Sequence, residues 1–294
     1  MEERKKRRGD RRDAYLVTDV TGLQKIMCHL WPKRTECEVY LHDVFDATEL
    51  VKYLEKKNAE HPEYKTTVFH ATVAGLARML RERPMMNRFI QGRRIYEHKE
   101  AVISFVAKRR FADGAEEALM FMSPKDHENI DDISKAIYGD VREIRKKEHT
   151  EGIDDTIDKI ASLPRFLVAL IIGIVRRLDY YGRNLRFLTE GDPNYSSVTV
   201  SNLGSIGCPS VYHHLSNYGS CSMLVTLGTL HKEEITMPDG HREIRDVVDI
   251  GATLDERIGD GFYFARSLKL IRHIFAHPEI LDMPLGENSG FDYR

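Results

Sequence analysis

Two short segments of the chain combine residue types that can stabilise charge or move a proton. The first, residues 196–207, reads as a strand that runs into a turn carrying Ser201, Asn202 and Gly204. Hydroxyl and amide groups at a strand end can donate hydrogen bonds to an oxyanion that forms during a reaction. An ordinary Ser-Asn turn explains the same residues without any function, so the segment alone leaves both interpretations open.

The second segment, residues 255–261, places acids, a base and glycines directly before the predicted final helix. Glu256 and Asp260 are the carboxylates that can act as a proton acceptor or as a structural acid. A salt-bridged corner, or a helix cap by Asp260, would use the same side chains. Both interpretations place this segment at the end of a strand.

Histidines supply the remaining candidates for proton transfer. His213 and His214 are neighbours in a segment predicted to be extended, so we expect their rings to face opposite sides. His273 and His277 are four residues apart on a predicted helix, a spacing that can bind a metal. The sequence offers no evident third ligand, so it predicts no metal site.

The composition excludes several classes of protein. Hydrophobic residues make up 41% of the 294 residues, which is enough for a sizeable core. The formal net charge is -2, without the basic excess typical of a nucleic-acid binder. The four cysteines form no C-x-x-C pair, which favours a reduced, cytoplasmic protein. Phosphate-binding and dinucleotide-binding glycine motifs are also missing.

The N-terminus has a charge opposite to that of the rest of the chain. The first twelve residues hold seven basic and three acidic groups, which leaves 37 basic against 43 acidic elsewhere, a net of -6. We therefore expect a basic flexible arm over residues 1–13 and one domain over residues 14–294. The arm can rest on an acidic surface of its own or a neighbouring subunit, or bind an anionic partner.

An apolar stretch interrupts the charged sequence at residues 166–175. These ten residues carry no charge and lie between Arg165 and the pair Arg176-Arg177. They are too few to span a bilayer. A buried or subunit-interface helix, a peripheral membrane contact through residues 165–177 and the lining for an acyl chain all remain open.

The hydrophobic patterns predict alternating helices and strands. Spacing of apolar residues, caps, turn residues and prolines indicates the following elements: a strand at 39–44, helices from 46 and over 66–83, a hairpin over 93–109, a helix after Asn129, strands at 196–203, 222–230 and 244–254 with a turn at 238–240, and a last helix from 261 to 278. This order predicts an α/β sandwich with helices against one sheet.

In this order, the motifs resemble a known family. Residues 198–207 (VTVSNLGSIG) are similar to the "F-T-I-S-N-L-G-x-x-G" of 2-oxo acid dehydrogenase acyltransferases, and residues 250–261 (IGATLDERIGDG) to their "L-S-x-D-H-R-V-x-D-G". Residues 83–87 (RPMMN) resemble their "H-P-x-x-N". The resemblance covers roughly residues 35–281, with residues 162–189 as an apolar helical insertion. The chloramphenicol acetyltransferase family is the more distant relative.

The resemblance implies both a fold and an activity. The fold is a chloramphenicol acetyltransferase-like two-layer sandwich, a mixed sheet with helices on one side. The activity is acyl transfer between coenzyme A and an acceptor in a homotrimer, with coenzyme A or acyl-coenzyme A as substrate and no covalently bound cofactor. By resemblance, Ser201 is the oxyanion donor and Asp260 the structural acid. We expect the substrate site to be lined by Asn202, Gly204, His213 and His214.

Glu256 occupies the position of the family's catalytic histidine. A carboxylate with a pKa of about 4.3 is roughly two units weaker as a base than an imidazole, or about 3 kcal/mol of driving force. Three hypotheses stay open: a stand-alone acyltransferase with Glu256 or a recruited histidine as base, an inactive trimeric scaffold or regulator, and a membrane-surface or partner-binding protein.

Overall fold

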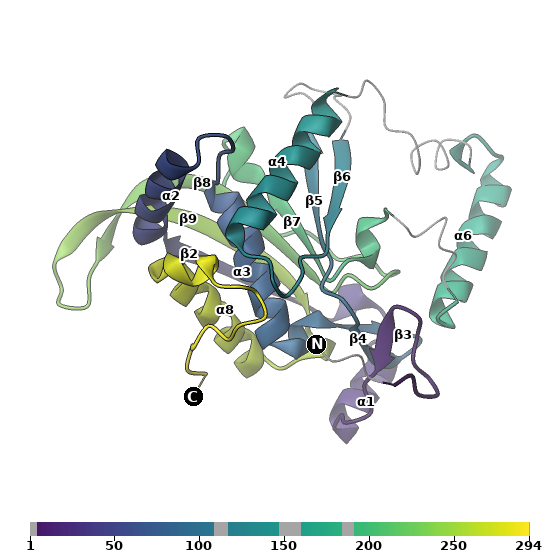
Figure 1. The fold of residues 1–294 in the computed structure, drawn as a ribbon. Helices are drawn as coiled ribbons and strands as arrows, with labels where there is room; N and C mark the ends of the chain where they lie inside the picture. The colour runs from purple at the N-terminus through teal and green to yellow at the C-terminus, as the bar shows by residue number, and fades with distance from the viewer. Residues whose placement is uncertain (1–4, 109–116, 147–159, 184–190, 294) are drawn as a thin grey trace.

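The protein has a six-stranded mixed sheet with helices packed on one of its faces (Figure 1). The computed structural model describes residues 5–108, 117–146, 160–183 and 191–293. β7 is parallel to both of its neighbours, and the other pairs are antiparallel. The strands, in spatial order, are β2 (Glu38–Asp46), β9 (Arg242–Asp255), β8 (Met223–Thr236), β7 (Val198–Asn202), β5 (Ile103–Lys108) and β6 (Glu117–Met122).

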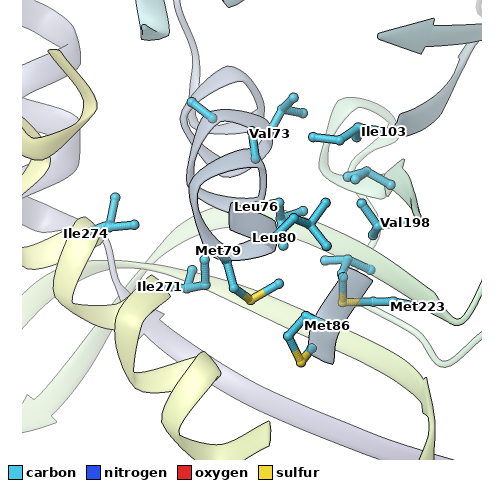
Figure 2. Packing of buried hydrophobic residues seen from close by; sticks show 14 of the residues in the cluster. Val73, Leu76, Met79, Leu80, Met86, Ile103, Val198, Met223, Ile271 and Ile274 are labelled. Carbon is cyan, nitrogen blue, oxygen red and sulfur yellow. The ribbon is translucent and has the colours of Figure 1, made fainter. Parts of the chain in front are cut away.

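The helical layer is centred on α3 (Val68–Glu82). Every residue from His70 to Leu80 is buried. α3 needs no polar stripe, because it lies between the sheet and the neighbouring helices α4 (Ile130–Lys146) and α8 (Gly261–Ala276), while α2 (Thr48–Glu60) packs against α8. Figure 2 shows side chains of α3 between strand residues on one side and α8 residues on the other.

A second, three-stranded sheet packs beside this core. It has the order β1 (Ala14–Leu16), β4 (Arg94–His98), β3 (Arg88–Gln91). The predicted hairpin over 93–109 is therefore wrong. β4 turns back onto β3 through Gly92 and Arg93, both with positive φ, whereas β5 joins the large sheet. Strand formers were recognised correctly, but the tight turn preceding them was missed.

The remaining elements are α6 and a set of shorter helices. α6 (Arg165–Tyr180) stands apart from the other helices (Figure 1). Within the described residues no helix is long and apolar enough to cross a membrane. The other short elements are α1 (Gly22–Leu30) and the single-turn helices η1 (Arg34–Glu36), η2 (Pro84–Asn87), η3 (Pro193–Tyr195), η4 (Leu203–Ile206), η5 (Glu256–Ile258) and η6 (Pro278–Asp282).

The C-terminal strands agree with the sequence-based prediction. β8 and β9 form a long hairpin that turns at residues 237–241, where Gly240 has a φ of 88°. Asn129 caps α4, since its side chain accepts a hydrogen bond from the backbone N–H of Asp131 at 2.9 Å. The α/β class, with helices against a mixed sheet, is confirmed.

No local sequence pattern predicts how the C-terminal tail is held. Residues 278–293 are held by two side chains of α3. The fully buried Arg78 donates to the carbonyls of Ile280, Met283 and Glu287 at 2.6–3.1 Å. The Glu82 carboxylate accepts hydrogen bonds from Ser289. Because these contacts join residues some 200 positions apart, a pattern of neighbouring residues cannot predict them.

Burial of His70 makes the stability of the fold depend on pH. Its Nδ1 lies within hydrogen-bond distance of the Thr67 backbone N–H, and burial lowers its pKa to about 4. The unfolded chain takes up a proton below about pH 6.5, whereas the folded chain resists it until about pH 4. Stability contributed by neutral His70 is therefore present above pH 6.5 and lost as the pH falls toward 4.

We predict that His70→Gln, which keeps an acceptor but cannot titrate, reduces this loss. Between pH 7 and pH 5 the free energy of unfolding should fall by about 2 kcal/mol less in the variant than in the wild type. Urea denaturation at both pH values measures the difference. Identical pH dependence of the two proteins would contradict the assignment.

Candidate active site

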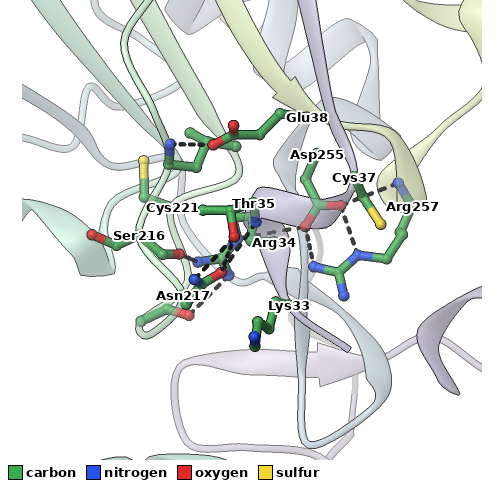
Figure 3. Close-up of polar contacts among 12 residues, drawn as sticks. Lys33, Arg34, Thr35, Cys37, Glu38, Ser216, Asn217, Cys221, Asp255 and Arg257 are labelled. Atoms are coloured by element: carbon green, nitrogen blue, oxygen red, sulfur yellow. Dashed lines mark hydrogen bonds and ion pairs between the residues drawn. The ribbon is translucent and has the colours of Figure 1, made fainter. Parts of the chain in front are cut away.

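The end of β9 is organised by a buried carboxylate between two buried guanidinium groups (Figure 3). Asp255 is fully buried, and Arg257 binds it with two hydrogen bonds, from Nε at 2.8 Å and from Nη2 at 2.7 Å. Arg34 of η1 forms an ion pair with it, Nε to Oδ2 at 3.4 Å. One carboxylate thus joins η1 and η5 to the end of the sheet.

The two arginines respond differently to burial. Burial lowers the pKa of Arg34, and the more distant Asp255 charge does not compensate fully. For Arg257, burial acts in the same direction, but the hydrogen bonds and charge of Asp255 outweigh it, so the pKa is raised. Burial also raises the pKa of the neighbouring Cys37 thiol to about 11. Cys37 is therefore protonated near neutral pH and is no thiolate nucleophile.

Arg34 also holds the segment that follows the two adjacent histidines. Its guanidinium donates to the carbonyls of Ser216, Tyr218 at 3.2 Å and Gly219 at 3.0 Å. The backbone N–H of Leu215 donates to the Glu38 carboxylate at 2.6 Å. Since Glu38 is the register partner of Asp255, the chain next to His214 lies at the same end of the sheet as Glu256.

Glu256 itself points away from the buried cluster. Its backbone N–H donates to the Cys37 carbonyl at 2.8 Å, and its side chain is exposed. Asp255 and Arg257, the residues on either side, are buried. The single turn η5 therefore presents the Glu256 carboxylate outward from a rigid base.

Asp260 acts as a helix cap in this chain. Its Oδ1 accepts a hydrogen bond from the Tyr263 backbone N–H at 2.7 Å, at the start of α8, and the residue is exposed. The arginines of this corner are held by Asp255. Sequence reasoning missed Asp255 and Arg34 as the structural pair. The Asp-x-Arg spacing after an apolar strand was visible, but nothing local linked it to a residue 221 positions earlier.

Ser201 lies at a different part of the sheet. It pairs in register with Thr226 of β8, which in turn pairs with Gly251 of β9. Glu256 is five residues beyond Gly251, about 17 Å along the strand and about 10 Å across, or roughly 20 Å away. Within one chain the structure does not bring Ser201 and Glu256 together.

The end of β7 and the turn after it contain Asn202 and Gly204, two of the residues predicted to line the substrate site. Asn202 ends the strand, and its carbonyl accepts a hydrogen bond from Ser205 Oγ at 2.8 Å. At Gly204 a Cβ would lie 2.4 Å from the carbonyl oxygen of Gly228. Only glycine fits this contact, so Gly204 has a structural role whether or not it meets substrate.

The prediction that the rings of His213 and His214 face opposite sides is wrong. Their rings stack, with centroids 4.6 Å apart and planes at 20°, instead of facing opposite sides. The physical reason is that residues 207–222 form no strand, so the period-two alternation does not apply. Both side chains are exposed. In the portions of the chain that the structure describes, no three His, Cys, Asp or Glu side chains are grouped to hold a metal ion.

Removing the charge of Asp255 should destabilise the fold strongly. Asp255→Asn leaves two buried guanidinium groups without a counter-charge, and we expect the free energy of unfolding to fall by about 3–5 kcal/mol. The matched control, Asp260→Asn, keeps a capping side chain at an exposed position and should cost less than about 1 kcal/mol. Chemical denaturation compares them, and equal losses would refute the structural assignment.

The comparisons with known proteins agree with this architecture. The sequence profile of the 2-oxoacid dehydrogenases acyltransferase (catalytic domain) matches residues 177–283, which include β7, β8, β9, η5 and α8. No curated protein matches the chain in sequence.

Solved structures resemble the chain over nearly its whole length. A probable dihydrolipoamide acetyltransferase from Listeria monocytogenes is 18% identical with a TM-score of 0.59, covering 95% of this chain and 98% of that chain. The cubic core of a pyruvate dehydrogenase multienzyme complex is 15% identical with a TM-score of 0.52 (92% and 94% covered). A chloramphenicol acetyltransferase is 12% identical with a TM-score of 0.56 (89% and 99% covered). The chain therefore has the chloramphenicol acetyltransferase-like fold and, over residues 177–283, resembles the catalytic domain of the 2-oxoacid dehydrogenase acyltransferases.

Proposed function

We propose that this protein transfers an acyl group between coenzyme A and an acceptor, at a site formed between the subunits of a homotrimer. The observation that carries the proposal is the separation of its two motifs. Ser201 and Glu256 both lie in the region that matches the acyltransferase family, yet the strand register keeps them roughly 20 Å apart in one chain. A site that uses both must combine two copies.

Assembly of this kind agrees with the exposed side chains at both motifs. Glu256 is exposed, and the apolar residues Ile206, Val211 and Tyr212 after the Ser201 strand are about half exposed. Apolar exposure around a functional motif is typical of a surface that another subunit covers. A solved structure of the same fold is the cubic core of a multienzyme complex, which supports self-association.

The chemistry assigns a role to each end of the intersubunit site. A base removes the thiol proton of coenzyme A, whose pKa is about 8.5, and the sulfur attacks the acyl carbonyl carbon. The Ser201 hydroxyl of the partner subunit donates a hydrogen bond to the resulting oxyanion. Collapse of the tetrahedral intermediate breaks the bond between the acyl carbon and the leaving heteroatom of the acyl donor. That heteroatom then takes the proton from the base. In the reverse direction coenzyme A is the leaving group.

Two kinds of base are available at the Glu256 end. Glu256 stands where the family motif has histidine, and His213 and His214 lie on the segment pinned to the same end of the sheet by Arg34 and Glu38. An imidazole is the stronger base toward a thiol by about 3 kcal/mol. The presence of two exposed histidines here therefore favours an active enzyme over an inactive scaffold.

Single substitutions distinguish the base. We expect Glu256→Gln or His214→Asn to lower acyl-coenzyme A turnover by at least about 100-fold if that residue is the general base. Hydrolysis-corrected release of free coenzyme A, measured across a panel of acyl chain lengths with thiol and amine acceptors, gives the rates. Asp260→Asn serves as a control for nearby charge loss. No turnover by the wild-type protein across this panel would favour an inactive scaffold.

Mixed trimers test whether the site lies between subunits. Ser201→Ala chains and chains lacking the base identified above should each be inactive alone. Co-expressed at equal levels, they should recover roughly a quarter of the wild-type activity, because some interfaces combine an intact Ser201 with an intact base. A particle mass three times the 34.0 kDa of the chain is expected. Absence of recovery would contradict an intersubunit site.

A further inference from the structure

α6 exposes an apolar stripe that no other described element covers. Phe166, Leu170 and Ile174 are 70%, 58% and 48% exposed, and their spacing of four residues places them on one line along the helix. The adjacent line, roughly 80–100° around the helix, with Leu167, Ile171 and Leu178, is only partly exposed. α6 stands apart from the other helices (Figure 1), and its most exposed large apolar side chains lie on this one line.

Hydrogen bonds and a close backbone contact hold the C-terminal end of α6 against the rest of the protein. The buried Asp179 carboxylate accepts hydrogen bonds from Gln91 Nε2 at 2.7 Å and from the Gly219 backbone N–H at 3.1 Å. Gly92 packs so closely under Tyr180 that a Cβ there would lie 2.4 Å from its carbonyl oxygen. The direction in which the apolar stripe points is therefore fixed by the fold.

The exposed charged side chains of α6 itself are all positive. Arg165 stands at one end of α6, Arg176 and Arg177 at the other, and all three are exposed. The one acid between residues 165 and 181 is Asp179, which is buried. The N-terminal segment lies beside the same end, since a Cβ at Gly182 would be 3.5 Å from Arg11 Cγ. This segment adds five exposed cations: Lys5, Lys6, Arg7, Arg8 and Arg12.

The positive charges of α6 determine which kind of partner can cover the apolar stripe. In an antiparallel pair of α6 helices, Arg165 would face Arg176 and Arg177 of the other copy, and in a parallel pair like residues would face each other. Both arrangements place cations against cations with no exposed acid on the helix to neutralise them. An anionic lipid surface offers negative charge to the arginines and an apolar layer to the stripe.

We propose that α6, together with the basic segment 5–12, attaches the protein peripherally to an anionic lipid bilayer. The helix is about 24 Å long and lies in the plane of the interface, with Phe166, Leu170 and Ile174 inserted. The arginines at its ends and Tyr181, which is 63% exposed, occupy the headgroup level. Stable attachment takes two signals, and this chain supplies both an apolar stripe and a polybasic segment.

Vesicle sedimentation tests the proposal with the full-length protein. We expect binding to vesicles of phosphatidylcholine with 30% phosphatidylglycerol, at least about tenfold weaker binding to phosphatidylcholine alone, and a further decrease in high salt. Leu170→Glu/Ile174→Glu should abolish binding. The matched control Ile244→Glu changes a residue that is 71% exposed on the β8–β9 hairpin and should bind like the wild type.

A second pair of variants separates the charge from the apolar contact. Arg176→Gln/Arg177→Gln should weaken binding about tenfold or more, whereas Lys56→Gln/Lys269→Gln, which removes two exposed cations from α2 and α8, should not. Unchanged thermal unfolding confirms that the variants are folded. Equal binding to neutral and anionic vesicles, or retained binding by Leu170→Glu/Ile174→Glu, overturns the proposal. So does an α6-dependent self-association seen by sedimentation velocity without any vesicle binding.

Discussion

The carboxylate of Asp255 has to neutralise two buried guanidinium groups, and the geometry of the candidate site depends on that interaction. A buried charge without a partner costs several kcal/mol, so Arg34 and Arg257 can stay inside only while Asp255 stays between them. The same arginines donate to backbone carbonyls of separate segments. Arg257 donates to that of Trp31, and Arg34 to those of Ser216, Tyr218 and Gly219. Three parts of the chain are thereby fixed at one corner of the sheet.

This arrangement explains how the motif can carry a glutamate without losing its shape. Asp255 and Arg257 point into the cluster, while Glu256 between them points outward and makes its bond to Cys37 through the backbone alone. The side chain at position 256 is therefore free to change without disturbing the ion pairs. Under the proposed resemblance, a glutamate in place of the motif histidine would alter proton transfer and leave the ion pairs unchanged, so fold similarity and catalytic competence are separate questions for this chain.

Sequence reasoning succeeded where the determinants are local. The hairpin turn at 237–241, the cap at Asn129 and the helix before Pro84 each depend on residues within a few positions, and the structure has all three. It failed where partners are distant or where the backbone is irregular. β4 pairs with β3 and β1 and not with β5, and the stacked rings of His213 and His214 follow from an irregular segment. The Arg34–Asp255 pair spans 221 positions, and no local spacing announces such a contact.

The outward-facing helix and the candidate site share one backbone residue, Gly219. Its N–H donates to Asp179 at the end of α6, and its carbonyl accepts from Arg34, which is paired with Asp255. Gly219 has a φ of 78°, and a Cβ there would lie 2.2 Å from the Asn194 carbonyl oxygen, so no other residue fits without displacing the chain. Both hydrogen bonds therefore depend on the position of this single residue, which supports the end of α6 on one side and the Arg34 guanidinium on the other. The orientation of α6 and the position of the histidine-bearing segment thus depend on the same conformationally restricted glycine.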